Sequence, residues 1–357
     1  MFLRVRAFGV FFFFFTSFNA FSQTTKTATI EEFFTTFNEY ATDMGGIMAL
    51  TSGLGLSWSD AFIGPLIDQI PHWGGGVSLG FATVKMENLK KLNDFMQIIM
   101  EPVFSGKQVN PLWAGEFRIG GFRTAPFDLG VKFGMIPAMA LFGESLYEMT
   151  LVGGDFRWRL NSGYGIAPKI SLGFEVNMIN GGYTSTPAAD AVIASALSSS
   201  GRPSGSRITA GEDAILKYLW NATVISAKIE FSKSFPFYGF TFYGGARGGF
   251  AITKTDFILS GENVAWGSSG SGSNKIASYN AAKLLTSATA IENFLPFGVL
   301  TLTNDAITVT YNGNAIDLQA NIGVAFDFGR NHISIAYMVA ILQVESGISI
   351  SYRYQQP

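Results

Sequence analysis

Cysteine is absent from the 357-residue chain, and histidine occurs only as His72 and His332. Without cysteine there is no disulfide, no thiolate nucleophile or metal ligand, and no lipid-modified N-terminal cysteine. Neither histidine has a second ligand at a metal-binding spacing. No set of histidine, serine and acidic residues marks an active site either. We therefore predict neither a metal nor another cofactor, and no enzymatic activity.

Charged residues and long apolar runs are also scarce. Only 14% of the residues are charged, against roughly 25% in an ordinary soluble domain, whereas 48% are hydrophobic. This composition indicates contact with lipid. A membrane-spanning helix needs roughly 20 apolar residues, but after the N-terminus the longest apolar runs, such as 335–342, stop at eight. A closed β-sheet is the other structure that can cross a bilayer.

The N-terminus has the features of a secretory signal. Arg4 and Arg6 give it positive charge without an acid, and an apolar stretch follows at 8–15. That stretch has eight residues, too few to span a bilayer as a helix. We therefore expect a signal peptide that is cleaved, not a permanent anchor.

The best cleavage site follows Ser22, because Ala20 and Ser22 then supply the small residues of the cleavage motif. Removal of residues 1–22 would leave a mature chain that starts at Gln23. This chain has 22 basic and 26 acidic side chains, a net charge of −4. The charge gives no support to a nucleic-acid partner.

Apolar and polar residues alternate with a period of two along most of the mature chain. Between 169 and 178 every even position is apolar, and every odd position is polar or glycine. The same alternation runs through 127–135 and 316–328, and it predicts strands with one apolar and one polar face. Seven further segments read similarly: 73–85, 113–121, 149–160, 222–232, 236–250, 331–342 and 345–354.

A secreted β-sandwich would show the same alternation. Most of the segments, however, have 9 to 14 residues, as tilted membrane-crossing strands need, and exceed the five or six that are common in globular sheets. Aromatic residues near the strand ends are typical of membrane interfaces; they are Trp73, Trp113, Tyr147, Trp158, Tyr238, Tyr352 and Tyr354. We predict an all-β fold, a transmembrane antiparallel β-barrel of about ten strands in a bacterial outer membrane.

The links between the strands alternate in length. The long ones are 86–112, 136–148, 180–221 and 251–314. Long loops of bacterial barrels are extracellular, so we place the short turns and both chain ends in the periplasm. Two other strand-like pieces, 54–58 and 307–311, would raise the count to twelve, which is the alternative.

A helical segment precedes the strands. Residues 29–32 read as a capping box, and one helical face carries Ile30, Phe33, Phe34, Phe37, Tyr40 and Met44. This helix could fill the lumen as a plug or dock at the periplasmic rim. We therefore divide the chain into a signal peptide (1–22), a plug-like segment (23–72) and the barrel (73–357). Helical spacing also recurs at 88–100 and 212–220 in the outer loops.

Fourteen charged residues fall on the polar faces of the predicted strands. They are Glu116, Arg118, Asp128, Lys132, Asp155, Arg157, Arg159, Lys169, Glu175, Lys228, Glu230, Arg247, Asp317 and Asp327. They could neutralise one another inside a filled barrel, or line a polar path or binding pocket. A ten-stranded barrel is only slightly wider than the eight-stranded kind that side chains fill, so a wide pore is not expected.

The segment 118–134, which reads RIGGFRTAPFDLGVKFG, and the strand at 152–155 resemble uncharacterised outer-membrane barrel proteins of spirochaete type. That resemblance implies a barrel without a named function. The N-terminal segment and the apolar helices in the loops are also similar to the long-chain fatty-acid uptake barrels. Those barrels have fourteen strands, more than we predict here.

The function predicted from these features is passage or uptake of small solutes, apolar ones included, across the outer membrane. The alternative is a non-transporting surface protein whose loops bind a partner. Outer-membrane lipid is the one expected partner besides a solute, and the sequence leaves the oligomeric state open. If solute passes Asp155, Arg157 and Arg159, neutral residues there should change selectivity more than stability.

The N-terminal features give a first testable prediction. Mass spectrometry of the protein purified from cells should find Gln23 as the first residue, and the protein should fractionate with outer membranes. An intact 1–22 segment on a protein of the inner membrane would contradict the prediction.

Overall fold

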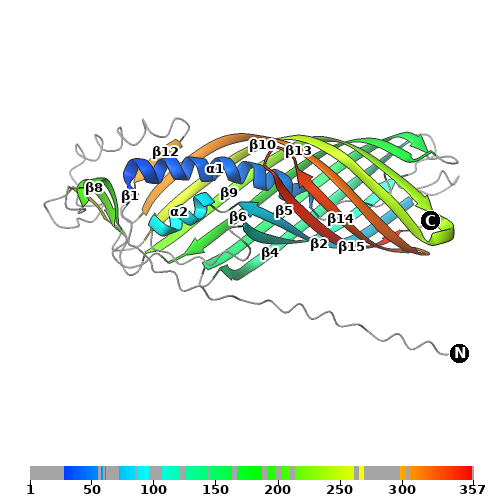
Figure 1. Cartoon of the computed structure of the whole chain (residues 1–357), viewed down its shortest axis with the longest axis horizontal. Coiled ribbons are helices and arrows are strands. Elements are labelled where there is room, and N and C mark those ends of the chain that lie inside the picture. The colour runs from blue at the N-terminus through cyan, green and yellow to red at the C-terminus, as the bar shows by residue number, and fades with distance from the viewer. Residues whose placement is uncertain are drawn as a thin grey trace, which may run out of the picture.

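Ten long strands, each antiparallel to both neighbours, form a closed barrel in a computed structural model of the chain (Figure 1). In chain order they are β2 (His72–Lys85), β3 (Lys107–Gly120), β4 (Phe127–Phe142), β5 (Ser145–Ser162), β6 (Lys169–Ser185), β9 (Ile215–Phe235), β10 (Phe240–Ser260), β13 (Ala306–Phe328), β14 (Asn331–Ala340) and β15 (Glu345–Gln355). Pairing of β15 with β2 and of β10 with β13 closes the ring. Closure pairs both edges of every barrel strand, as a lipid environment demands.

The structure describes residues 28–54, 58, 61, 72–85, 87–95, 107–120, 126–142, 145–162, 167–186, 192–197, 203–209, 214–260, 265–268, 298–302 and 306–355. The predicted signal peptide lies outside these residues and stays a prediction.

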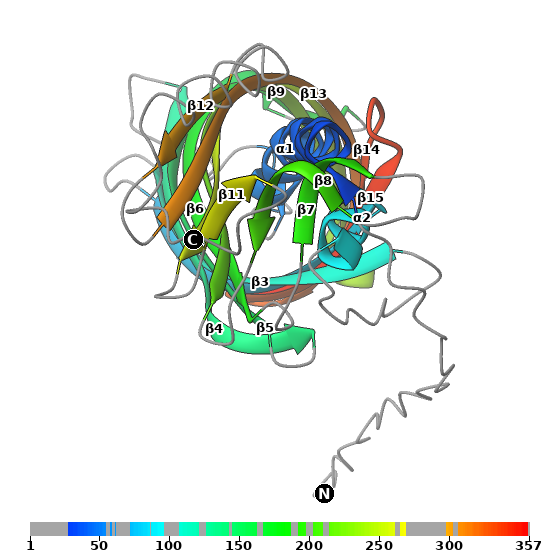
Figure 2. The ribbon, with the colours of Figure 1, turned by 90° about the vertical axis from the view of Figure 1, so that its left-hand side faces the viewer.

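The remaining elements gather at one end of the barrel (Figures 1 and 2). They are β1 (Ala28–Thr29), α1 (Ile30–Gly53), α2 (Glu87–Phe95), β7 (Val192–Leu197), β8 (Pro203–Thr209), β11 (Ala265–Ser268) and β12 (Gly298–Leu302). Strands β1, β7, β8 and β11 form a small sheet in that order, and β12 pairs with β13. The 3-10 turn η1 (Pro236–Tyr238) lies at the other end, between β9 and β10.

The predicted all-β fold and the count of ten strands are confirmed. The twelve-strand alternative is wrong, because 307–311 belongs to β13 and Leu54 follows the end of α1. Residues 55–57 lie outside the described part of the chain. Helix α2 confirms the first part of the helix predicted at 88–100; residues 96–100 are not among those described.

Most strands are longer than predicted, and the long links are correspondingly shorter. The segment 136–148 consists mainly of the adjoining ends of β4 and β5. Strand β6 reaches Ser185 and β9 starts at Ile215, so the helix predicted at 212–220 is wrong from 215 onward. The links predicted at 86–112, 180–221 and 251–314 shrink to 86–106, 186–214 and 261–305.

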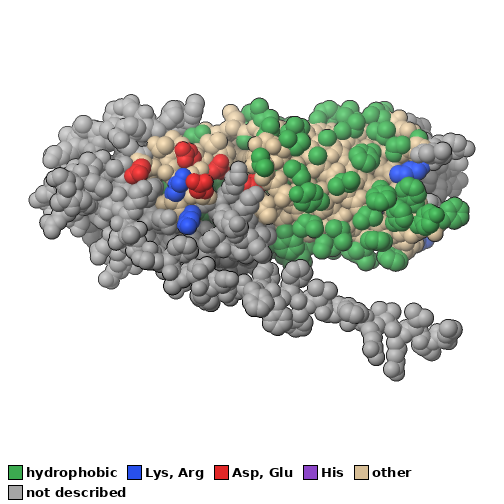
Figure 3. Space-filling view, in the orientation of Figure 1, with side chains coloured by type: hydrophobic (Ala, Val, Ile, Leu, Met, Phe, Trp, Pro, Cys, Tyr) green, Lys and Arg blue, Asp and Glu red, His purple; other side chains and the backbone are tan. Residues whose placement is uncertain are grey.

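An apolar belt covers the outside of the barrel toward its short-turn end (Figure 3). Side chains such as Val131, Phe174 and Ile322 are about 60% exposed there (60%, 58% and 62%), with charged residues directed inward between them. In water this surface would be strongly unfavourable, whereas lipid chains cover it well. Trp73, Trp113, Trp158, Tyr238 and Tyr352 of the predicted aromatic girdle are exposed, but Tyr147 is buried in the lumen, contrary to that prediction.

A row of polar residues, called the polar ring below, marks the limit of the belt on five of the ten strands. Residues Thr150, Asn180, Asn221, Lys254 and Asn312 stand directly opposite one another across five neighbouring strands. The Asn221 side-chain amide donates a hydrogen bond to the Asn180 side-chain oxygen. Beyond this ring the same strands continue toward the long links, and a bilayer that covers the belt would leave this part of the barrel in water.

The lumen changes from charged to apolar at the same level, whereas the outer surface changes from apolar to polar. On the membrane side of the ring, the lumen contains charged residues such as Arg118, Asp128 and Glu175. On the water side, the lumen-facing row is Tyr147, Tyr183, Tyr218, Phe257 and Val309, all buried and directly opposed in register. The outer part is therefore built like a soluble sheet, apolar inside and polar outside.

Helix α1 lies inside the lumen and starts at the end with the long links (Figure 2). Strand β1, directly before it, pairs with β7 of the β6–β9 link, and the Asn88 amide donates 2.8 Å to the Asp43 carboxylate of α1. Ala28, the first described residue, therefore lies at the end of the barrel with the long links, and the expected periplasmic location of the chain ends stays a prediction. Within the described residues, no helix is long and apolar enough to cross a membrane.

The belt predicts how stability depends on position. Phe174→Arg places a charge near the middle of the belt and should reduce the free energy of unfolding by about 2 to 4 kcal/mol. Leu160→Arg, near the short-turn end, should cost about 1 kcal/mol or less because the charge reaches the interface. Urea unfolding from lipid vesicles measures both, with Phe174→Leu as the size control. Equal losses for the two arginine variants would contradict a bilayer at this level.

Candidate functional site

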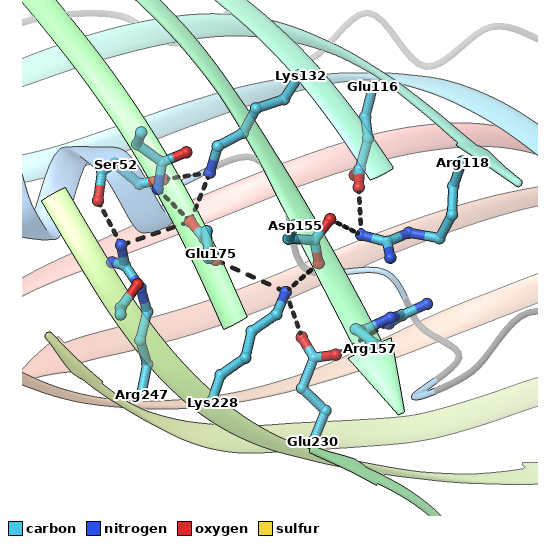
Figure 4. Close-up of polar contacts among 12 residues, drawn as sticks. Ser52, Glu116, Arg118, Lys132, Asp155, Arg157, Glu175, Lys228, Glu230 and Arg247 are labelled. Carbon is cyan, nitrogen blue, oxygen red and sulfur yellow. Dashed lines mark hydrogen bonds and ion pairs between the residues drawn. The ribbon is translucent and has the colours of Figure 1, made fainter. Parts of the chain in front are cut away.

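The C-terminal end of α1 is held by three side chains of the barrel wall, two of which, Lys132 and Arg247, are labelled in Figure 4. Lys132 Nζ of β4 donates to the Ser52 carbonyl at 2.7 Å. Arg247 of β10 donates to the Ala49 carbonyl at 3.0 Å and to Ser52 Oγ at 2.6 Å, and Gln319 Nε2 of β13 also donates to the Ala49 carbonyl at 3.0 Å. The last carbonyls of a helix lack partners and carry partial negative charge. Two cations therefore cap α1 in the middle of the lumen.

Close approach of α1 to the wall depends on glycine. A Cβ atom on Gly53 would lie 2.6 Å from Gln319 Oε1 and 3.0 Å from Arg247 Nη1, and a Cβ atom on Gly45 would lie 3.0 Å from Ala315 Cβ. A larger residue at either position would push the helix away from β13. The predicted plug position in the lumen is thus the one that the sequence of α1 permits.

Glu175 links this cap to a wider network of charges. Its carboxylate accepts from Lys132 Nζ at 2.7 Å and lies 3.4 Å from Arg247 Nη2 and 3.6 Å from Lys228 Nζ. Lys228 Nζ in turn lies 2.7 Å from Asp155 and 3.3 Å from Glu230. Each carboxylate in this part of the lumen is shared between cations from neighbouring strands.

Two arginines complete the network. Arg118 contacts Glu116 at 2.8 Å, Asp155 at 2.6 Å and Asp128 at 2.5 Å. Arg157 binds both oxygens of Asp128, at 2.9 and 2.8 Å, and Glu230 at 2.9 Å. Such paired geometry offsets the large cost of taking charges out of water. Arg118 can pass across β4 because Gly130 leaves room: a Cβ there would lie 2.6 Å from Arg118 Nη2.

Asp317 also joins this network, 3.6 Å from Arg247. The structure thus brings eleven of the fourteen predicted charged residues together. Asp327 lies apart from these contacts near the short-turn end, where it accepts from Thr241 Oγ1 at 2.8 Å and contacts His332 Nδ1 at 2.7 Å. Arg159 and Lys169 are half-buried nearer the short-turn ends of β5 and β6.

Several participants were not predicted. Ser52, Gln319 and Asn177, whose amide donates to Glu175, enter the network, and Trp58 lies between two guanidinium groups, 5.4 Å from that of Arg118 and 4.6 Å from that of Arg353. Arg353 follows the same alternation as the predicted residues and was detectable in the sequence. Ser52 was not, because no sequence pattern shows how deep a helix enters a barrel.

The outer half of α1 packs on the aromatic row. Its Phe33 and Phe37 rings lie 5.0 and 5.9 Å from the Phe257 ring, and Tyr40 lies 5.4 Å from Tyr218. All five side chains are at most 3% exposed. The helix is therefore bound by apolar contacts on the long-link side of the polar ring and by hydrogen bonds on its short-turn side.

Two cavities lie beside the plug. One of about 40 Å³ is bounded by Gly53, Lys228, Arg247, Gln319 and Met338 among others, and one of about 20 Å³ lies beside Trp58, His332 and Arg353. Each has room for one or a few water molecules. Neither could hold a solute while α1 is in place.

No protein-family model matches the chain, and comparison with curated proteins gives no match. Among solved structures, the translocator domain of the autotransporter NalP from Neisseria meningitidis has 10% identity and a TM-score of 0.35, covering 90% of this chain and 97% of that chain. A FadL homologue from Pseudomonas aeruginosa has 9% identity and a TM-score of 0.26 over 88% and 97%. The toluene transporter TodX from Pseudomonas putida has 10% identity and a TM-score of 0.26, covering 86% of this chain and 97% of that chain.

These likenesses are too distant to transfer a residue or a role, and the spirochaete-type resemblance of 118–134 stays a prediction. The class of protein follows from the molecule itself. A closed antiparallel barrel with an apolar outer belt and a charged interior is a β-barrel of outer-membrane type.

The network leads to a prediction that differs from the expectation that Arg157 affects selectivity more than stability. Arg157 is completely buried, so Arg157→Met leaves Asp128 and Glu230 short of a partner and should reduce the free energy of unfolding by about 3 to 5 kcal/mol. Urea unfolding measures the loss, and Arg159→Met on the same strand, which is only half-buried, should lose much less. Comparable losses for the two variants would show that the network does not hold the barrel together.

Proposed function

We propose that the protein allows small solutes to cross the outer membrane and that α1 is the movable obstruction in its path. The observation that carries the proposal is that a separate segment, not the wall side chains alone, fills the lumen. An α-helix with its side chains is about 10 Å across. Its withdrawal would leave a passage of small-molecule size through a barrel that is otherwise too narrow for an open pore.

The contacts of α1 are of a kind that would let the helix leave the lumen and return to it. At its inner end α1 accepts a few hydrogen bonds from the wall, and the cations that cap it keep other partners in Glu175 and Asp317 when it leaves. Lys132 and Arg247 would therefore remain paired in an open barrel.

The chain offers a direct test because it lacks cysteine. Gly45→Cys on α1 with Ala315→Cys on β13 would place two Cβ atoms 3.0 Å apart, so a small outward shift of the helix, which the added side chain itself causes, brings them to the roughly 3.5–4.5 Å that a disulfide needs. In liposome-swelling assays with small uncharged solutes, oxidation should abolish permeability and reduction should restore it. The single variant Ala315→Cys, which cannot form the bond, should not respond to the oxidant.

Equal permeability before and after oxidation would mean that α1 does not obstruct the path, and the proposal would fail. If both forms are impermeable, the alternative gains support, namely a surface protein that binds a partner at its outer end. The sheet of β1, β7, β8 and β11 favours that alternative, since it adds an ordered structure beyond the barrel mouth.

A further inference from the structure

The aromatic row forms a chamber in the water-exposed part of the barrel. Tyr147, Tyr183, Tyr218 and Phe257 come from four consecutive strands and stand side by side on the lumen face. Trp220 lies next to them, its ring 5.6 Å from that of Tyr147. Because the chamber is on the outer side of the polar ring, it is the first part of the lumen that a solute from outside would reach.

Rings of α1 occupy this chamber in the closed state. The Phe33 and Phe257 planes meet at 70°, those of Phe37 and Phe257 at 64°, and those of Tyr40 and Tyr218 at 63°. Edge-to-face contact is the arrangement that free aromatic molecules also prefer with such rings. The three side chains of α1 thus mark positions that the ring of a small solute could take.

The chamber is apolar but contains hydrogen-bonding groups that α1 leaves unused. Among the described residues, the Tyr218 hydroxyl and the Trp220 indole N–H are buried without a hydrogen-bond partner. The Tyr218 hydroxyl lies close enough to the Tyr40 and Tyr183 hydroxyls for their charges to interact. Burial raises the pKa of Tyr40 well above its ordinary value, so this hydroxyl stays neutral. A buried polar group without a partner is unfavourable in an apolar site, and the oxygen of a ligand placed against Tyr218 would give that hydroxyl a partner.

We propose that this chamber binds a small aromatic molecule that carries a hydroxyl group, a simple phenol, in place of the α1 side chains. The inference rests on the proposed function and names the class of solute. The ring would replace Phe37 or Tyr40 against Tyr218 and Phe257. Its hydroxyl would hydrogen-bond with the Tyr218 hydroxyl, which a hydrocarbon of the same size cannot do.

Titration calorimetry on the full chain in detergent micelles tests the inference, with phenol and toluene as the two ligands. In the reduced Gly45→Cys, Ala315→Cys protein, phenol should bind at least about fivefold more tightly than toluene, the ratio that one net hydrogen bond gives. Oxidation should remove phenol binding because α1 then stays in the chamber. The oxidised protein has the same micelle and so corrects for phenol that dissolves in detergent.

Tyr218→Phe keeps the ring and removes the hydroxyl. In this variant the affinities for phenol and toluene should agree within about twofold, whereas Tyr337→Phe on the lipid-facing side of β14 should keep the phenol preference. Phenol binding that survives oxidation, or a preference that survives Tyr218→Phe, would overturn the inference. If phenol binds as expected but oxidation leaves solute permeability unchanged, the phenol site is supported and the proposed passage through the barrel is contradicted.

Discussion

Five neighbouring strands of this barrel, β5, β6, β9, β10 and β13, pass from lipid into water, and the rest of the structure depends on that change of surroundings. In lipid the outward side chains must be apolar, so the polar ones point inward and have to be paired there. In water the preference reverses. The polar ring from Thr150 to Asn312 is the level at which the reversal happens. It leaves one lumen with two unlike halves, a charged one and an aromatic one.

Helix α1 matches both halves, which explains why it lies where it does. Its rings face the aromatic row, and its C-terminal carbonyls reach the cations below. A helix in the opposite direction would present its N-terminal N–H groups, with partial positive charge, to Lys132 and Arg247. The direction of α1, and with it the outer location of Ala28, is therefore set by electrostatics at one helix end.

The sequence was sufficient for the ten strands and for most of the charged lumen, because lipid imposes a strict alternation over the belt. It was not sufficient for the outer parts of the strands. At Leu151–Val152, Met178–Ile179 and Val224–Ile225, two apolar residues follow one another and the alternation changes phase. Such a break is typical of a strand end, so the residues beyond it were assigned to loops. Burial shows that each strand continues with the same inner and outer faces, and that the apolar residues move from the outer face to the inner one.

Partners within the network were harder to predict than its members. Asp128 and Arg157 are direct cross-strand neighbours, and the alternation placed both on the inner face. The pair of Arg118 with Asp155 spans an intervening strand, which requires Gly130 between them and is visible only in three dimensions. The contacts to Ser52 and Ala49 depend on the depth and direction of α1, which lie outside any pattern in the strands.

Residues 54–71 join α1 covalently to β2, and this connection makes the helix an intramolecular ligand of its own barrel. A tethered ligand acts at an effective concentration on the order of millimolar, whatever the amount of protein in the membrane. A free solute that takes the place of the α1 side chains competes against that concentration. The fraction of barrels with solute in the chamber would consequently rise with the concentration of the compound outside the cell. The concentration needed for half occupancy would depend on the length of the linker that tethers α1.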